Sequence, residues 1–127
     1  MFFPWERARG PFRVLGRARA GVVLGVVAVL VLGWMIHERE EKLASIRATR
    51  ASIGDAERAV SSYRADHSGA CPRDLGELVA GGYASDVPID AWGRPLRVTC
   101  PGLRDPKGFD VSSDGPDGVL GGLDRVE

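Results

Sequence analysis

The stretch AGVVLGVVAVLVLGWMI, residues 20–36, contains neither a charged residue nor a proline. A helix rises about 1.5 Å per residue and the hydrocarbon core of a bilayer is about 30 Å thick, so this segment is just long enough to cross a membrane. The alternative is a buried helix of a soluble protein. It is disfavoured because the rest of a 127-residue chain is too small to bury so uniformly apolar a helix. We therefore predict a transmembrane helix at residues 20–36.

The charges on the two sides of this segment predict its orientation. Five arginines and one acid precede it, and the charged run EREEK at residues 38–42 follows it. Positive residues mark the cytoplasmic side, so we expect a cytoplasmic basic leader at residues 1–19 and a domain at residues 37–127 on the other side of the membrane, attached by a single pass. A cleaved secretory signal is the alternative, but small residues rather than charges normally follow its apolar region.

Beyond the apolar segment, the sequence predicts that the helix continues. Residues 38–68 contain no proline, and their apolar side chains recur at intervals of three, four or seven. That spacing is typical of one face of an amphipathic helix. We expect a single helix from about Gly21 to His67, ended by Gly69 and followed by Pro72.

The rest of the chain predicts a small sheet beside this helix. The segment PRDLGELVAGGY, residues 72–83, is typical of a short helix with Pro72 in its first turn and two glycines at its end. Apolar and polar residues then alternate at residues 96–100 and 109–111, which predicts two short strands. The fold class is therefore α+β, with a long N-terminal helix, half transmembrane and half amphipathic, packed on a small antiparallel sheet.

Cys71 and Cys100 both lie in the part of the chain that we expect to be exported. In an oxidising compartment an even number of cysteines indicates a disulfide, which here would close a loop of about 30 residues. Two free buried thiols would be favoured only if the membrane topology were inverted.

Three motifs in order suggest a family. SYRADHSGACP, VPIDAWGRPLRV and FDVSSDGPDGVLGG follow the membrane helix at residues 62–72, 87–98 and 109–122. In this order the chain resembles type IV pilin-like proteins, and most closely the major pseudopilin of type II secretion systems. The pilin-like fold is part of that resemblance. The residues that match the family's structural turn are Pro88, Asp90, Trp92 and Gly93.

The resemblance implies a function and a set of partners. Subunits of this family pack their apolar helices into a short periplasmic filament that helps protein export across the outer membrane. The resemblance therefore implies that residues 37–127 are a periplasmic pseudopilin-like domain attached by one pass through the inner membrane. It implies contacts with other pseudopilin subunits, with inner-membrane secretion assembly proteins and with membrane lipid. It also implies a calcium ion held by the C-terminal loop.

The N-terminal segment departs from the prepilin pattern. RARAG at residues 17–21 resembles the end of a prepilin leader, but residues 22–26 include neither the aromatic residue nor the glutamate that follow such a leader. Cleavage after Gly21 and glutamate-dependent assembly are therefore open. The alternative function is a membrane-anchored periplasmic binding or adaptor domain that reuses the pilin fold without polymerising.

The C-terminal loop contains hard oxygen ligands of the kind that calcium prefers. The segment from Asp110 begins like an EF-hand loop but has Gly121 at the twelfth position, where a bidentate glutamate is needed, so an EF-hand is rejected. The resemblance instead implies Asp117 and Asp124 as side-chain ligands, with Asp114 as a third. The alternative is a series of solvated turns in which Asp and Gly occur only because turns favour them.

The sequence does not favour catalysis or nucleic-acid binding. His37 and His67 have no partners at the spacing of a metal site or a catalytic triad. The N-terminal arginines are explained by the membrane orientation, and the exported part is not basic. We predict a structural protein rather than an enzyme.

Overall fold

The computed structural model describes residues 12–122 and 124–127. It consists of the helix α1 (Phe12–Asp66), the short helix α2 (Leu75–Ala80) and the strands β1 (Arg97–Thr99) and β2 (Asp110–Ser112). The predicted α+β class with a long N-terminal helix and a small antiparallel sheet is confirmed. The chain divides into two compact units, one up to Glu40 and one from Glu41 onward, and each is described by itself.

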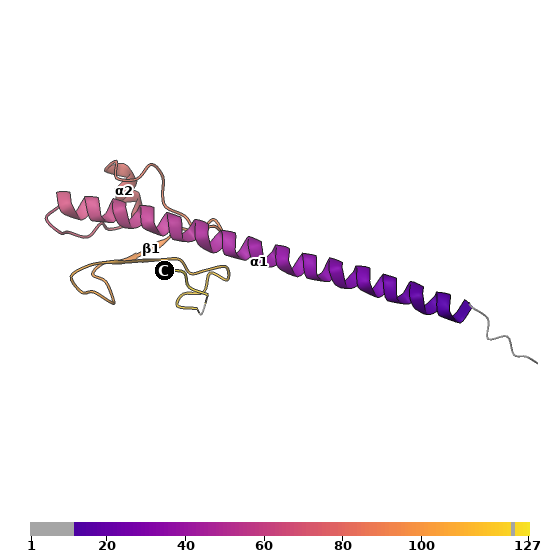
Figure 1. The fold of residues 1–127 in the computed structure, drawn as a ribbon. Coiled ribbons are helices and arrows are strands. Elements are labelled where there is room, and N and C mark those ends of the chain that lie inside the picture. The colour runs from indigo at the N-terminus through magenta and orange to yellow at the C-terminus, as the bar shows by residue number, and fades with distance from the viewer. Residues whose placement is uncertain (1–11, 123) are drawn as a thin grey trace, which may run out of the picture. The chain divides into compact units, whose positions relative to one another are not determined.

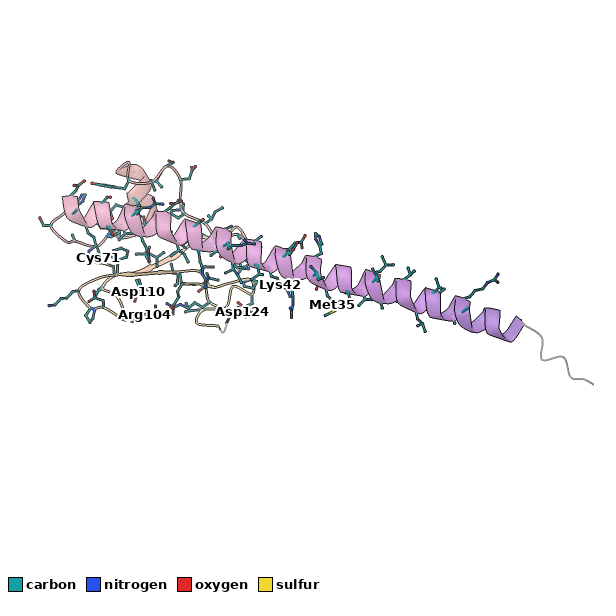
Figure 2. All side chains as sticks on the ribbon, viewed as in Figure 1. Met35, Lys42, Cys71, Arg104, Asp110 and Asp124 are labelled. Carbon is teal, nitrogen blue, oxygen red and sulfur yellow. A yellow bond between two sulfur atoms is a disulfide. The ribbon has the colours of Figure 1, made fainter. Side chains whose placement is uncertain are left out.

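The first unit contributes the apolar part of α1. Within the described residues, α1 begins at Phe12, so the predicted start at about Gly21 was wrong. The helix extends further because residues 12–20 contain no proline and are rich in arginine and alanine, which favour helix. The apolar side chains from Val22 to Ile36 are exposed, as Figure 2 shows for Met35. By length and composition, this helix could cross a membrane.

The second unit is built on the C-terminal part of α1. The predicted apolar face is buried, with Ile53 and Ala56 in one cluster and Ala59, Val60 and Tyr63 in another. Figure 1 shows α2 and β1 beside this part of the helix. The helix ends at Asp66, one residue before the predicted end.

The helix α2 is shorter than predicted. Asp74 is its N-cap, with an extended backbone and a side chain that accepts a hydrogen bond from the Glu77 amide at 2.9 Å. Pro72 therefore precedes the helix instead of lying in its first turn, because the capping aspartate satisfies the free N–H groups that begin a helix. Leu78 of α2 is fully buried against the second cluster of α1.

The two strands pair antiparallel, with Val98 opposite Val111. Val111 of β2 and Leu96, just before β1, join the cluster around Ile53, so this part of the chain packs on the apolar face of α1. A disulfide between Cys71 and Cys100 ties the segment after α1 to the end of β1, with 5.8 Å between the Cα atoms. A bridge that closes a loop of this size contributes about 3.5 kcal/mol to stability on the chain-entropy model.

Candidate functional site

The predicted structural turn is organised by Asp90. Its Oδ1 accepts hydrogen bonds from the backbone amides of Trp92 and Arg94, at 3.0 and 2.9 Å. The Asp90 amide donates to the Arg94 carbonyl, and the Leu96 amide donates to the Pro88 carbonyl. Gly93 has φ of 80°, a left-handed conformation that residues with a side chain rarely adopt. The spacing of this motif is therefore explained by one carboxylate that closes a tight turn.

A series of hydrogen bonds between buried groups connects this turn to α1 and to the C-terminal loop. Thr49 Oγ1 on α1 accepts a hydrogen bond from the Ala91 amide at 3.1 Å. Ser113 Oγ donates to Asp90 Oδ2 at 2.7 Å and accepts from the Gly115 amide at 3.1 Å. Thr49 and Ser113 are fully buried and Asp90 is 4% exposed. Each of these polar groups thus has a protein partner, as buried polar groups require.

The C-terminal loop, residues 113–126, begins and ends at one backbone pair. The Ser113 amide donates to the Val126 carbonyl at 2.9 Å, and the Val126 amide donates to the Ser113 carbonyl at 3.1 Å. Val126 is also part of the core cluster around Ile53. The loop is therefore closed at its base by backbone pairing and anchored by an apolar side chain.

Of the three predicted metal ligands, Asp114 is paired with an arginine. Its two carboxylate oxygens share the single Nε–H of Arg97 on β1, at 2.9 and 2.7 Å. The same arginine forms an ion pair with it. No group of three or more His, Cys, Asp or Glu side chains that could share a metal ion occurs among residues 12–122 and 124–127. The structure does not bring Asp114, Asp117 and Asp124 together as a three-carboxylate site, because β1 supplies a cation for the first of them.

Asp117 is placed among other oxygen atoms. Its Oδ1 accepts from the Val119 amide at 3.1 Å. Its Oδ2 and the Val119 carbonyl oxygen both lie 3.3 Å from the position that a Cβ on Gly122 would occupy. The Asp124 carbonyl oxygen lies against Gly115, and Figure 2 shows Asp124 in the loop region. Two oxygens thus flank the open side of Gly122, and one of them, the Val119 carbonyl, also accepts a hydrogen bond from the Gly122 amide at 3.1 Å.

The structure adds a residue to which the sequence had assigned no role. Arg94 Nη1 donates to the Gly115 carbonyl at 2.8 Å, and its Nη2 donates to the Pro116 carbonyl at 2.6 Å. A Cβ on Gly118 would clash with the Arg94 guanidinium. The arginine was visible in the turn motif, but nothing in the sequence indicated which backbone it would reach.

The rejected EF-hand residue Asp110 also has a different role. Its Oδ2 accepts hydrogen bonds from the Leu103 and Arg104 amides, at 2.6 and 3.2 Å. Asp110 thus holds the connection between the two strands, and Figure 2 shows it with Arg104 in that region.

A second polar cluster attaches α2 to the end of α1. Tyr63 Oη donates to Glu77 Oε1 at 2.9 Å, and the Arg73 amide donates to Glu77 Oε2 at 2.6 Å. These bonds, the Arg73 amide first, hold the pKa of Glu77 below its usual value, while the bond to Glu77 and burial raise the pKa of Tyr63. His67 stacks on Tyr63 with 3.9 Å between ring centroids. His67 Nδ1 also lies 2.8 Å from the Tyr63 carbonyl oxygen, so Tyr63 positions this histidine by both its ring and its backbone.

The fold and this loop define a class: a pilin-like protein in which the helix α1 could cross a membrane and leads into a small α+β domain. The family model of type II secretion system protein G matches residues 36–127. The chain therefore belongs to the type II secretion protein G family, the major pseudopilins, which are structural components that work with other parts of the secretion system. The match begins at the end of the apolar segment and leaves residues 1–35 outside it. No curated protein and no solved structure matches the chain significantly.

Proposed function

We propose that this chain is a structural subunit of a type II secretion filament, in which it helps protein export across the outer membrane. The observation that supports this most is the family match over residues 36–127, which covers the Trp92 turn and the complete C-terminal loop. The exposed apolar face from Val22 to Ile36 is the surface that lipid, and then neighbouring subunits, would cover.

In this proposal the unprocessed chain passes once through the inner membrane, with residues 1–19 in the cytoplasm and residues 37–127 in the periplasm. The disulfide between Cys71 and Cys100 supports this orientation, because disulfides persist in oxidising compartments. The partners would be other pseudopilin subunits and inner-membrane assembly proteins.

Calcium belongs to the same proposal. Asp117 and Asp124, with carbonyl oxygens of the C-terminal loop, would bind the ion, and Asp114 would remain paired with Arg97. The support is the convergence of Asp117 Oδ2 and the Val119 carbonyl beside Gly122. When bound, calcium would link Asp117 to Asp124 within the loop through its positive charge.

The N-terminus of the mature chain tests whether the chain is processed as a filament subunit. We expect mass spectrometry of the mature chain, purified from the membrane of its own cells, to find an N-methylated residue at Val22 and no basic leader. A mature chain that retains the leader would contradict a polymerising subunit and support the non-polymerising adaptor.

A second measurement separates the two functions independently of processing. We expect overproduction to yield sheared, pelletable filaments that contain the chain. An adaptor would remain entirely in the membrane fraction under the same conditions. Export of secreted proteins in a deletion strain should return with the wild-type chain.

A further inference from the structure

We propose that Arg94 is the positioning residue that holds the C-terminal loop closed on the Trp92 turn, so that the loop keeps its conformation without a divalent cation. The proposal does not depend on whether the chain polymerises or binds calcium. It rests on the contacts of one guanidinium group.

The backbone of Arg94 is fixed before its side chain reaches the loop. The Arg94 amide donates to Asp90 Oδ1 at 2.9 Å, and its carbonyl accepts from the Asp90 amide at 2.8 Å. Asp90 is itself buried and bonded to Ser113. The side chain therefore starts from a rigid position, which reduces the conformational entropy lost when the guanidinium binds.

The guanidinium then holds two consecutive carbonyls of the loop. Nη1 donates to Gly115 and Nη2 to Pro116, at 2.8 and 2.6 Å. The Gly115 carbonyl also accepts from the Gly118 amide at 3.3 Å, so the arginine binds the outside of a tight turn that the loop itself forms. Two parallel donors in a fixed fork are the geometry that distinguishes arginine from lysine.

The C-terminal loop has a glycine, Gly118, where the Arg94 guanidinium lies against it. At Gly118 a Cβ would clash with the guanidinium, and the φ of 69° there also favours glycine. The loop contains the acidic residues Asp114, Asp117 and Asp124, of which Asp114 is already paired with Arg97. Arg94 thus brings a permanent positive charge to an acidic loop, and it does so through neutral carbonyls that leave the Asp117 and Asp124 carboxylates for other partners.

Hydrogen exchange of the full-length chain in detergent micelles tests the proposal. Peptides covering residues 113–122 report on the loop, and peptides covering residues 56–63 of α1 report on the core. In EDTA we expect the wild-type loop to remain protected. In Arg94→Gln, also in EDTA, we expect the loop to exchange about tenfold or more faster, with the α1 peptides unchanged. Arg50→Gln, on an exposed position of α1, is the matched control and should behave as wild type.

Arg94→Lys provides the second variant. It keeps the charge but cannot reproduce the fork, so we expect exchange between those of wild type and Arg94→Gln. If Arg94→Gln also unfolds α1, Arg94→Lys decides: faster loop exchange with a protected α1 supports the proposal, and exchange equal to wild type overturns it. A wild-type loop that opens in EDTA as far as the loop of Arg94→Gln would overturn it in favour of the metal. A protected loop in Arg94→Gln would overturn it as well.

Discussion

At the scale of single residues, Asp90 is a buried carboxylate with hydrogen-bond partners in two separate segments. One carboxylate closes the Trp92 turn through Oδ1 and binds Ser113 through Oδ2, so it joins two segments that are far apart in the sequence. Its burial makes this role sensitive to substitution, because a buried polar group that loses a partner also loses its solvation.

Asp90→Asn tests this role. The amide oxygen can still accept from the turn, but the amide NH₂ cannot accept the proton of Ser113 Oγ. We expect a loss of about 1–3 kcal/mol in the free energy of unfolding, measured by denaturant titration of the full chain in mild detergent with circular dichroism. Asp86→Asn, at an exposed position shortly before the turn, is the control and should change stability little. Equal stabilities of the two variants would contradict the role of Asp90.

At the scale of elements, α2 is attached to α1 by a mixture of apolar and polar contacts. Leu78 is buried against Val60, and the carboxylate of Glu77 accepts a hydrogen bond from the Tyr63 hydroxyl. Tyr83 donates to Asp66 at 2.8 Å, a bond that raises the pKa of Tyr83. The polar contacts fix where α2 lies along α1, since a helix of six residues has too few apolar side chains to do so alone.

The pH dependence of this contact has a definite sign. The pKa of Glu77 is lower in the folded chain than in the unfolded one, so its contribution is complete above its ordinary value and is lost as the pH falls through the folded value. We expect stability to decrease on acidification below about pH 4.5 and α2 amides to exchange faster, and Glu77→Gln to flatten this part of the profile.

Glu57→Gln is the matched control for that measurement. Glu57 is exposed on α1 and should leave the acid-dependent change as in wild type. An acid profile of Glu77→Gln that coincides with the wild-type profile would show that the contact does not contribute through Glu77.

At the scale of the whole molecule, calcium is expected to act through the unfolding equilibrium. A ligand that binds the folded chain alone stabilises it by an amount that rises with its concentration. We therefore expect calcium to raise the unfolding temperature of the wild-type chain, measured by calorimetry with calcium and with EDTA. Asp117→Ala should lose this increase.

Asp114→Asn distinguishes the role of Asp114 from that of Asp117. Because Asp114 is paired with Arg97, its removal should lower stability in EDTA and leave the calcium-dependent increase intact. An increase that survives in Asp117→Ala, or no increase in wild type, would exclude the calcium site as proposed.

Much of the molecule follows from local patterns in the sequence. The uncharged run at residues 20–36 and the apolar spacing from Leu43 to Tyr63 are sufficient to predict the long helix, because helix formation depends on neighbours within one or two turns. The alternation around Val98 and Val111 similarly predicted the two strands that the structure pairs. The start of α2 was missed because one capping hydrogen bond, rather than the position of a proline, decides it.

The sequence by itself determined the class of fold, the candidate membrane segment and the acidic character of the C-terminal loop. Only the tertiary structure decided which residues contact that loop. Arg97 pairs with Asp114, and Arg94 binds the carbonyls of Gly115 and Pro116. The reason is that a helix or strand is encoded by neighbouring residues, whereas a buried contact requires segments about 20 residues apart to be brought together by a core. Asp90 takes part in both kinds of contact, because it accepts a local hydrogen bond from the Arg94 amide and a long-range one from Ser113.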